Sequence, residues 1–277
     1  MLRKLALVVS FACLVFVAAM IVSCGSSKTH LGTMCTGGPF NVVGDWQGTL
    51  TTNGTNQNLA GVINSQGQAL FFDSDSLASH DPASGSVAAL PAITGACSFS
   101  GTATGYGAFG VAGGTTSGAV SGNVNSASSI SGTITVNSVQ SSFSLTSFSP
   151  LTGTPTSLAG NLGGAIEGAA PGLLPLTFTP GSGNNMTFTN DLILAPNCTT
   201  SGSATQEGTT NIFDISITIS GTGAGCPPAA TVTGLGFESN TDYFGASGVN
   251  PVPGTYLYAI SSTSAFVLEV YPPPAGR

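Results

Sequence analysis

Apolar and hydroxyl-bearing side chains alternate along much of this chain. The clearest run is FDISITI, residues 213–219, in which every second side chain is apolar. A period of two puts alternate side chains on opposite faces of a β-strand, so the run predicts a strand with one buried face. The same alternation predicts strands at 130–136, 142–146, 256–260 and 266–270. No stretch of the body shows a convincing helical period.

Turn signals separate these runs. Asn53-Gly54, the GSG of residues 181–183 and the PVPG of residues 251–254 are typical of chain reversals. Short strands joined by turns, without helices, predict an all-β fold made of antiparallel β-barrels or β-sandwiches.

Two internal similarities suggest a duplicated unit. Residues 97–104 resemble residues 198–205, and GDWQGTL at 44–50 resembles GNLGGAI at 160–166. Two halves of about a hundred residues each are of ordinary domain size. We therefore expect two β-rich domains, at 39–150 and 151–277. A leader at 1–23 and a flexible tether at 24–38 would precede them.

The amino terminus follows a different pattern. Arg3 and Lys4 precede residues 5–22, which are apolar except for Ser10. This is the layout of a secretory signal, and its apolar run is also about the minimum for an uncleaved helical membrane anchor. Either alternative places the body outside the cytoplasm, because the basic residues stay inside.

Residues 21–24, IVSC, decide between these alternatives. The stretch resembles the lipobox of bacterial lipoproteins, with Ile21, Val22 and Ser23 before the modified Cys24. The resemblance implies cleavage before Cys24 and acylation of that residue, for example with palmitate, and Gly25 then favours the outer membrane. Two or more acyl chains hold a protein stably on a bilayer, whereas one does not. The alternative is a buried or disulfide-bonded Cys24 after an uncleaved helix.

The scarcity of charge excludes several functions. Charged residues are 5% of the chain, against about a quarter in typical soluble domains. Between Thr29 and Gly276 there is no Lys or Arg, so the body lacks the cations that nucleic acids and phosphate groups require, and the lysine of a Schiff-base enzyme. With few ion pairs to screen, its stability should depend little on salt.

Four cysteines remain once Cys13 leaves with the leader and Cys24 is lipidated. In an oxidising compartment an even number predicts two disulfides, and four cysteines allow three pairings. Cys198 and Cys226 flank the strand at 213–219, so a hairpin could bring these two together. Cys35 and Cys97 would then be left for the first half. The disulfide candidates are Cys35, Cys97, Cys198 and Cys226.

The densest polar cluster is FFDSDSLASHD, residues 71–81. It supplies Asp73, Asp75, His80 and Asp81 as candidate ligands for Ca²⁺ or a transition metal. A hydrophilic loop explains the same residues. No G-x-S-x-G elbow, P-loop or zinc spacing occurs, and we expect neither enzymatic activity nor a cofactor.

Gly44-Asp45-Trp46 resembles the G-x-W opening of lipocalins and related calycin barrels. The resemblance implies a tryptophan packed near the closed end of a barrel, against a basic residue from a late strand. That basic residue is missing here. The alternative is that Trp46, the only tryptophan, is a core anchor of the first strand.

These observations together predict a lipid-anchored, non-enzymatic protein of the cell envelope with a binding or structural role. Its partners would be membrane lipid through Cys24 and an unidentified envelope component, or a small apolar ligand if a barrel interior is hollow. One alternative is a surface interaction or adhesion module that pairs through exposed strands. Another is a secreted hydrolase.

Overall fold

The computed structural model describes residues 38–74, 87–106, 115–148, 160–167, 172–173, 176–181, 185–190, 198–221, 230–239, 256–261 and 267–271. Every secondary-structure element in these residues is a β-strand, which confirms the all-β prediction. Residues 37–277 form one compact unit. The leader, nearly all of the tether and the boundary near residue 150 lie outside the described residues, so the division into two domains stays a prediction.

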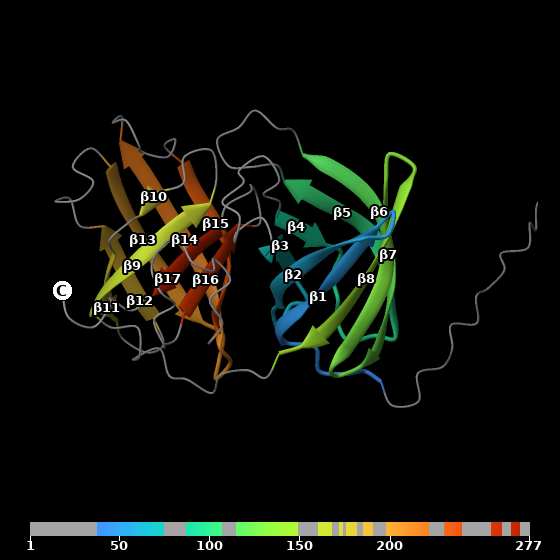
Figure 1. Ribbon diagram of the computed structural model, residues 1–277. Coiled ribbons are helices and arrows are strands. Elements are labelled where there is room, and N and C mark those ends of the chain that lie inside the picture. Colours follow the sequence, from blue (N-terminus) through green and yellow to red (C-terminus); the bar gives the residue numbers. More distant parts are fainter. Residues whose placement is uncertain are drawn as a thin grey trace, which may run out of the picture. The chain divides into compact units, whose positions relative to one another are not determined.

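The first eight strands pair in chain order and close into an antiparallel barrel (Figure 1), because β1 pairs with β8 as well as with β2. Consecutive pairing makes this an up-and-down barrel rather than a sandwich. The strands are β1 (Gly44–Thr52), β2 (Thr55–Ile63), β3 (Ala69–Asp73), β4 (Val87–Leu90), β5 (Ser98–Tyr106), β6 (Thr116–Ser126), β7 (Ser129–Val136) and β8 (Val139–Ser147).

Two of its hairpins use two-residue turns with positive φ at both positions. Asn53 and Gly54 join β1 to β2 with φ of 51° and 81°, and the predicted turn is confirmed. Asn137 and Ser138 join β7 to β8 with φ of 48° and 66°. Positive φ at both positions is the type I′ geometry that matches the twist of the flanking strands. Gly54 adopts this geometry without strain, whereas Ser138 adopts it with strain because its Cβ disfavours positive φ.

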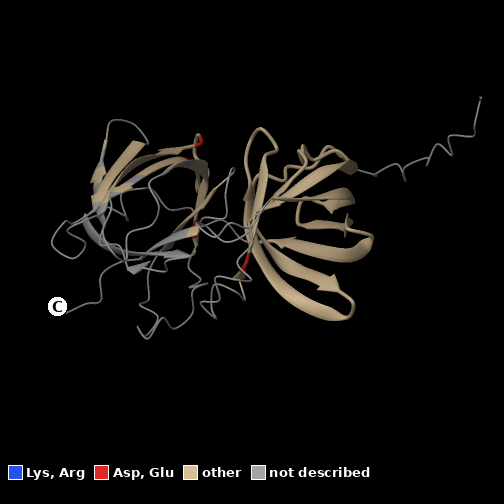
Figure 2. Ribbon diagram, turned by 90° about the horizontal axis from the view of Figure 1, so that it is seen from above, with Lys and Arg blue, Asp and Glu red and all other residues tan. Residues whose placement is uncertain are grey.

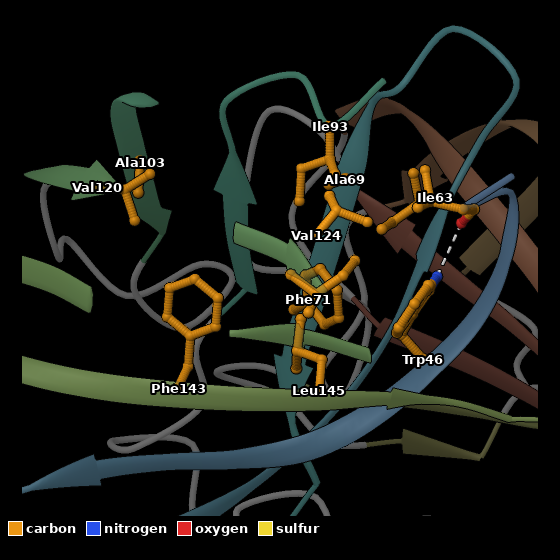
Figure 3. Packing of buried hydrophobic residues seen from close by; sticks show 12 residues of the cluster. Trp46, Ile63, Ala69, Phe71, Ile93, Ala103, Val120, Val124, Phe143 and Leu145 are labelled. Atoms are coloured by element: carbon orange, nitrogen blue, oxygen red, sulfur yellow. Dashed lines mark hydrogen bonds between the residues drawn. The ribbon is translucent and has the colours of Figure 1, made fainter. Parts of the chain in front are cut away.

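The interior of the first barrel is a packed core (Figure 3). Trp46 is 1% exposed, and its indole Nε1 donates a hydrogen bond to the carbonyl oxygen of Val42 at 2.9 Å. Trp46 is thus a core anchor of the first strand. The buried core residues are Val42, Trp46, Ile63, Ala69, Phe71, Ile93, Ala103, Val120, Val124, Ile130, Phe143 and Leu145.

Inward-facing glycines make room for aromatic rings. Gly122 lies opposite Phe99 in the pairing of β5 with β6, and Gly132 lies opposite Phe143 in the pairing of β7 with β8. A Cβ at either glycine would collide with the ring opposite. Glycine in a strand interior often marks such a close approach.

The remaining strands form a second antiparallel sheet. Its pairings run from β9 through β11 to β17 and return to β9, so they also make a ring. β10 pairs with β9 beside β11, as if the two were one interrupted strand. The strands are β9 (Gly160–Glu167), β10 (Gly172–Leu173), β11 (Leu176–Pro180), β12 (Asn185–Asn190), β13 (Cys198–Gln206), β14 (Ile212–Gly221), β15 (Ala230–Ser239), β16 (Tyr256–Ser261) and β17 (Val267–Tyr271).

The predicted strands are found within these elements. The 213–219 run lies in β14, and its apolar side chains Phe213, Ile215 and Ile217 are buried while Asp214 and Thr218 are exposed. The other four predicted runs coincide with β7, β8, β16 and β17. Period-two alternation therefore located strands well.

The suggested duplication stays a prediction. GDWQGTL and GNLGGAI both fall on the first strand of their ring, β1 and β9. Residues 97–104 contribute to β5, the fifth strand of the first ring, whereas residues 198–205 lie in β13, the fourth strand of the second ring if β10 and β11 count as one. The second similarity therefore does not fall on equivalent strands.

A second core joins the first barrel to the second sheet. Outward side chains of β2, β3 and β4, called here the apolar face, are Ala60, Val62, Leu70, Phe72 and Val87. They pack against Ile212, Leu235, Phe237, Tyr258, Ile260 and Val267. The rings of Phe72, Phe237 and Tyr258 lie with centroids 5.3–6.4 Å apart, within the range for favourable aromatic contacts.

Candidate functional site

A buried carboxyl group and the backbone of a second buried acid meet one amide where the first barrel contacts the turn between β13 and β14. Asp45 lies on β1, next to Trp46 but on the opposite, outward face. The side-chain Nδ2 of Asn211 donates a hydrogen bond to Asp45 Oδ2 at 2.6 Å and another to the backbone oxygen of Glu238 at 3.1 Å. We call Asp45, Asn211 and Glu238 the Asn211 bridge.

The backbone holds the bridge in place. Asn211 follows the turn after β13, and its carbonyl oxygen accepts a hydrogen bond from the amide of Glu238 at 3.1 Å. The carbonyl oxygen of Asp45 accepts another from the amide of Phe148 at 2.8 Å. Each member is therefore fixed by backbone contacts within its own part of the molecule, so the side-chain bond joins two well-anchored segments.

The bridge is withdrawn from solvent. Asp45 and Asn211 are each 3% exposed, and Glu238 is 0% exposed. One oxygen of Asp45 and both carboxyl oxygens of Glu238 are buried without a hydrogen-bond partner among the described residues. A buried polar group without a partner costs about 1–3 kcal/mol, and a charged one more.

Burial controls the protonation of both acids. It raises the pKa of Asp45 to about 8, against a smaller lowering by the hydrogen bond from Asn211 and a further increase from the nearby Glu238. Burial also raises the pKa of Glu238 to about 7. Asp45 therefore keeps its proton at neutral pH and Glu238 is near its midpoint, because desolvation disfavours the charged form.

A second polar contact lies beside the bridge. The amide of Ser65, in the turn between β2 and β3, donates a hydrogen bond to Glu207 Oε2 at 3.0 Å. Asp214, on the exposed face of β14, has a raised pKa caused by partial burial and by the charge of Glu207. The β13–β14 turn thus contacts the barrel at two points, both through acidic side chains.

The arrangement holds protons rather than processing a substrate. A general acid must lie within hydrogen-bond reach of the group it protonates. Glu238 has no exposed surface and Asp45 almost none. The bridge is a buried contact between two parts of one chain.

The predicted metal cluster is described only at Asp73. That residue ends β3, where its Oδ2 accepts a hydrogen bond from Gln57 Nε2 at 3.3 Å. Asp75, His80 and Asp81 lie outside the described residues. Among the described residues, no group of three acidic, histidine or cysteine side chains is placed to hold a metal ion.

The predicted cysteine sites are only partly described. Cys97 is disulfide-bonded. No disulfide joins two side chains that the structure describes, so its partner stays a prediction. Cys198 begins β13, but its side chain is not described, and Cys24, Cys35 and Cys226 lie outside the described residues.

The outward side chains of β5 to β8 form an uncharged surface, the hydroxyl face. All are exposed or half-buried, and all but one carry a hydroxyl or an amide. They include Ser98, Ser100, Thr102, Thr104, Ser117, Ala119, Ser121, Asn123, Asn125, Ser129, Ser131, Thr133, Thr135, Gln140, Ser142, Ser144 and Thr146. Figure 2 shows no basic residue on the described ribbon and few acidic ones.

Neighbouring strands place these polar groups side by side. Ser121 pairs in register with Thr133, and their hydroxyl oxygens lie 3.4 Å apart. Asn125 Nδ2 donates a hydrogen bond to Ser131 Oγ at 3.0 Å. Ser131 in turn pairs with Ser144 on β8. The hydroxyl face is therefore continuous across three strands.

Sequence reasoning missed the Asn211 bridge. Glu238 was only one of several scattered glutamates, although it lies in the apolar run GLGFES of residues 234–239. An acidic residue in an apolar strand of a chain almost without cations is the signal that would have marked it. The proximity of Asp45 to Asn211, 166 residues later, had no local signal.

Among the described residues, no helix has the length and apolar character needed to span a bilayer. No protein-family model matches the chain, and no curated protein matches its sequence.

Proposed function

We propose that this protein is a non-enzymatic component of the cell envelope, anchored by lipid on Cys24, which binds a neutral polysaccharide through its hydroxyl face. The observation that carries the proposal is the continuous, uncharged array of hydroxyls and amides on β5 to β8. The lipobox-like residues 21–24 support the anchor. Two folded regions attached by that anchor, at 39–150 and 151–277, remain part of the proposal.

The chemistry of the face favours a neutral polymer of hydroxyl groups. Hydroxyls and amides both donate and accept hydrogen bonds, as sugars do. An anionic polymer would require Lys or Arg, and the sequence has neither between Thr29 and Gly276. Many weak contacts along a repeating polymer add through multivalency, so no single pocket is needed.

The other binding modes have less support. Side chains such as Trp46, Phe71 and Phe143 occupy the interior of the first barrel, which argues against a small apolar ligand there. Pairing through an exposed strand has no support at β16, because β15 and β17 cover both of its edges. A hydrolase has no catalytic constellation among the described residues.

The anchor is tested by expressing the full chain with and without Cys24→Ala in a Gram-negative host and separating the membranes. Loss of membrane attachment in the variant, with a lipid-modified mass in the parent, is the expected result. Attachment that persists without Cys24 would mean that residues 5–22 act as a spanning helix, and the lipid anchor would be wrong.

The binding face is tested with immobilised dextran as a neutral polysaccharide and dextran sulfate as an anionic one. The double variant Ser121→Ala/Thr133→Val should lose at least severalfold in retention on dextran. The matched control is Thr218→Val/Thr231→Val, because these exposed threonines of β14 and β15 also have hydroxyl oxygens in contact, at 3.3 Å. Equal retention of both variants, or preference for dextran sulfate, would contradict the proposed face.

A further inference from the structure

We propose that the Asn211 bridge is a proton-dependent latch, which holds the β13–β14 turn of the second sheet on the first barrel while its carboxyl groups are protonated and loosens when they ionise. This goes beyond the proposed function and does not depend on it.

The geometry makes the bridge a contact between two parts of the molecule. Asp45 belongs to the first barrel, whereas Asn211 and Glu238 belong to the second sheet. One amide nitrogen of Asn211 contacts the carboxyl group of Asp45 at 2.6 Å and the backbone oxygen of Glu238 at 3.1 Å. Any change in the charge of Asp45 therefore acts on a bond that crosses from one part to the other.

Protons are the available means of neutralising these acids. The chain has no Lys or Arg from Thr29 to Gly276, and neither His30 nor His80 lies in the described residues. An ionised carboxyl buried without a cation is costly by several kcal/mol. Glu238 has no exposed surface and no hydrogen-bond partner for either oxygen among the described residues, so its surroundings favour the neutral acid.

Neighbouring titratable groups supply no positive charge to the bridge. Glu207 lies in the same turn and Asp214 on β14, while Asp73 on β3 and the tyrosines Tyr258 and Tyr106 belong to strands packed around the joint. None of these groups becomes positive at any pH. Each ionisation therefore adds negative charge to a region that has no positive charge to offset it.

The direction of the pH effect follows from the two shifts. The ordinary pKa values are 3.8 for Asp45 and 4.5 for Glu238, and in the folded protein they rise to about 8 and about 7. The folded state thus binds more protons than the unfolded state at intermediate pH. The stabilisation that the two protonated carboxyl groups give the folded state is complete below about pH 4. It is lost as the pH rises through 7 and 8.

The experiment is hydrogen exchange on the purified full chain in detergent at pH 5, 7 and 9, corrected for intrinsic exchange rates. We expect protection in β2, β3, β15 and β16 to fall at pH 9 by up to about tenfold per pH unit and per carboxyl. Strands β6 and β7, which pair neither with β1 nor with β2, β3 or β4, should change much less. A uniform loss of protection in all strands would overturn the latch.

The decisive variant is Asp45→Asn/Glu238→Gln, which replaces both acids by neutral amides of the same size. In this variant the protection of β2, β3, β15 and β16 from hydrogen exchange should stay the same from pH 5 to 9. Asp214→Asn is the matched control, because Asp214 is an exposed carboxyl of the neighbouring strand, and it should retain the wild-type fall. A double variant as sensitive as the wild type would overturn the proposal.

A direct titration keeps the proposal testable if the double variant does not fold. Carbon-13 NMR of the side-chain carboxyls in the wild-type chain should show two groups that titrate between about pH 6 and 9 and that disappear singly in Asp45→Asn and in Glu238→Gln. Titration of every carboxyl below pH 5 would overturn the proposal.

Discussion

The apolar face and the hydroxyl face belong to the same barrel and are built on the same inward pattern. Strands β2 to β4 turn Val62, Leu70 and Phe72 outward, whereas β6 to β8 turn Ser121, Thr133 and Ser144 outward. The first set is covered by the second sheet and the second set is not. The comparison teaches that inward residues close the barrel, while outward residues decide what the barrel contacts.

The largest expected effect comes from Phe72→Ala on the apolar face. Phe72 is 1% exposed and touches the rings of Phe237 and Tyr258. Its removal should lower the free energy of unfolding by about 3–5 kcal/mol. The matched change on the other face, Ser144→Ala, should cost no more than about 0.5 kcal/mol. Chemical denaturation measures both, and similar losses would contradict the contrast between the faces.

Gly132→Ala tests the interior that both faces share. Its Cβ would overlap the ring of Phe143 and the backbone of Ser121, so we expect a loss of about 1–3 kcal/mol from overpacking. Ser131→Ala, one residue earlier and outward, is the control and should be nearly neutral. A neutral Gly132→Ala would show that the Phe143 ring is free to move aside.

Asn211→Ala asks how much one polar bond adds to the apolar contact. The variant removes the side chain that donates a hydrogen bond to Asp45 and should lower stability by about 1–3 kcal/mol at pH 6. The comparison is Asn125→Ala on the hydroxyl face, where an exposed amide bonds Ser131 and the loss should stay below about 0.5 kcal/mol. Equal losses of stability in the two variants would show that burial does not strengthen the contribution of the Asn211 hydrogen bond.

Ser138→Gly gives a smaller effect at the end of the hydroxyl face. Ser138 has φ of 66°, and glycine at that position should raise stability by about 0.5–1 kcal/mol. The reverse change in the equivalent turn, Gly54→Ala, should lower stability by a similar amount, because space is open there and only φ opposes the new side chain. Thermal unfolding compares the two, and changes of the same sign would contradict this account.

Salt should have the smallest effect of all. Lys28 and Arg277 are the only Lys or Arg residues beyond the leader, so few ion pairs are available to screen. The free energy of unfolding at pH 6 should change little between dilute and molar sodium chloride. A large change in the free energy of unfolding would show that charge interactions stabilise one of the two faces.

The sequence allowed the strands to be predicted but not what they contact. Period-two alternation located β14, β7 and β8, because a half-buried strand repeats its pattern locally. The ALFF of residues 69–72 is apolar on both faces, which signals burial on both sides without naming the partner. That partner, Phe237 and Tyr258, lies far along the chain, and no local pattern encodes such a contact.

The candidate site was less accessible still. Asp45 was noticed only as part of Gly44-Asp45-Trp46, and Glu238 as an isolated acid. Their unusual protonation results from burial, and burial depends on how the β13–β14 turn meets β1. The absence of Lys and Arg, by contrast, was readable at once, and it turns this contact into a proton-dependent one.

The closure of β1 onto β8 also affects how molecules of this protein behave when they are crowded. Proteins with few charges repel one another weakly, and open sheets then tend to aggregate by extending into a neighbour. In the first barrel the hydrogen-bonding edge of every strand is already occupied by another strand of the same chain. The closed barrel thus makes a chain with 5% charged residues less dependent on charge repulsion to prevent aggregation.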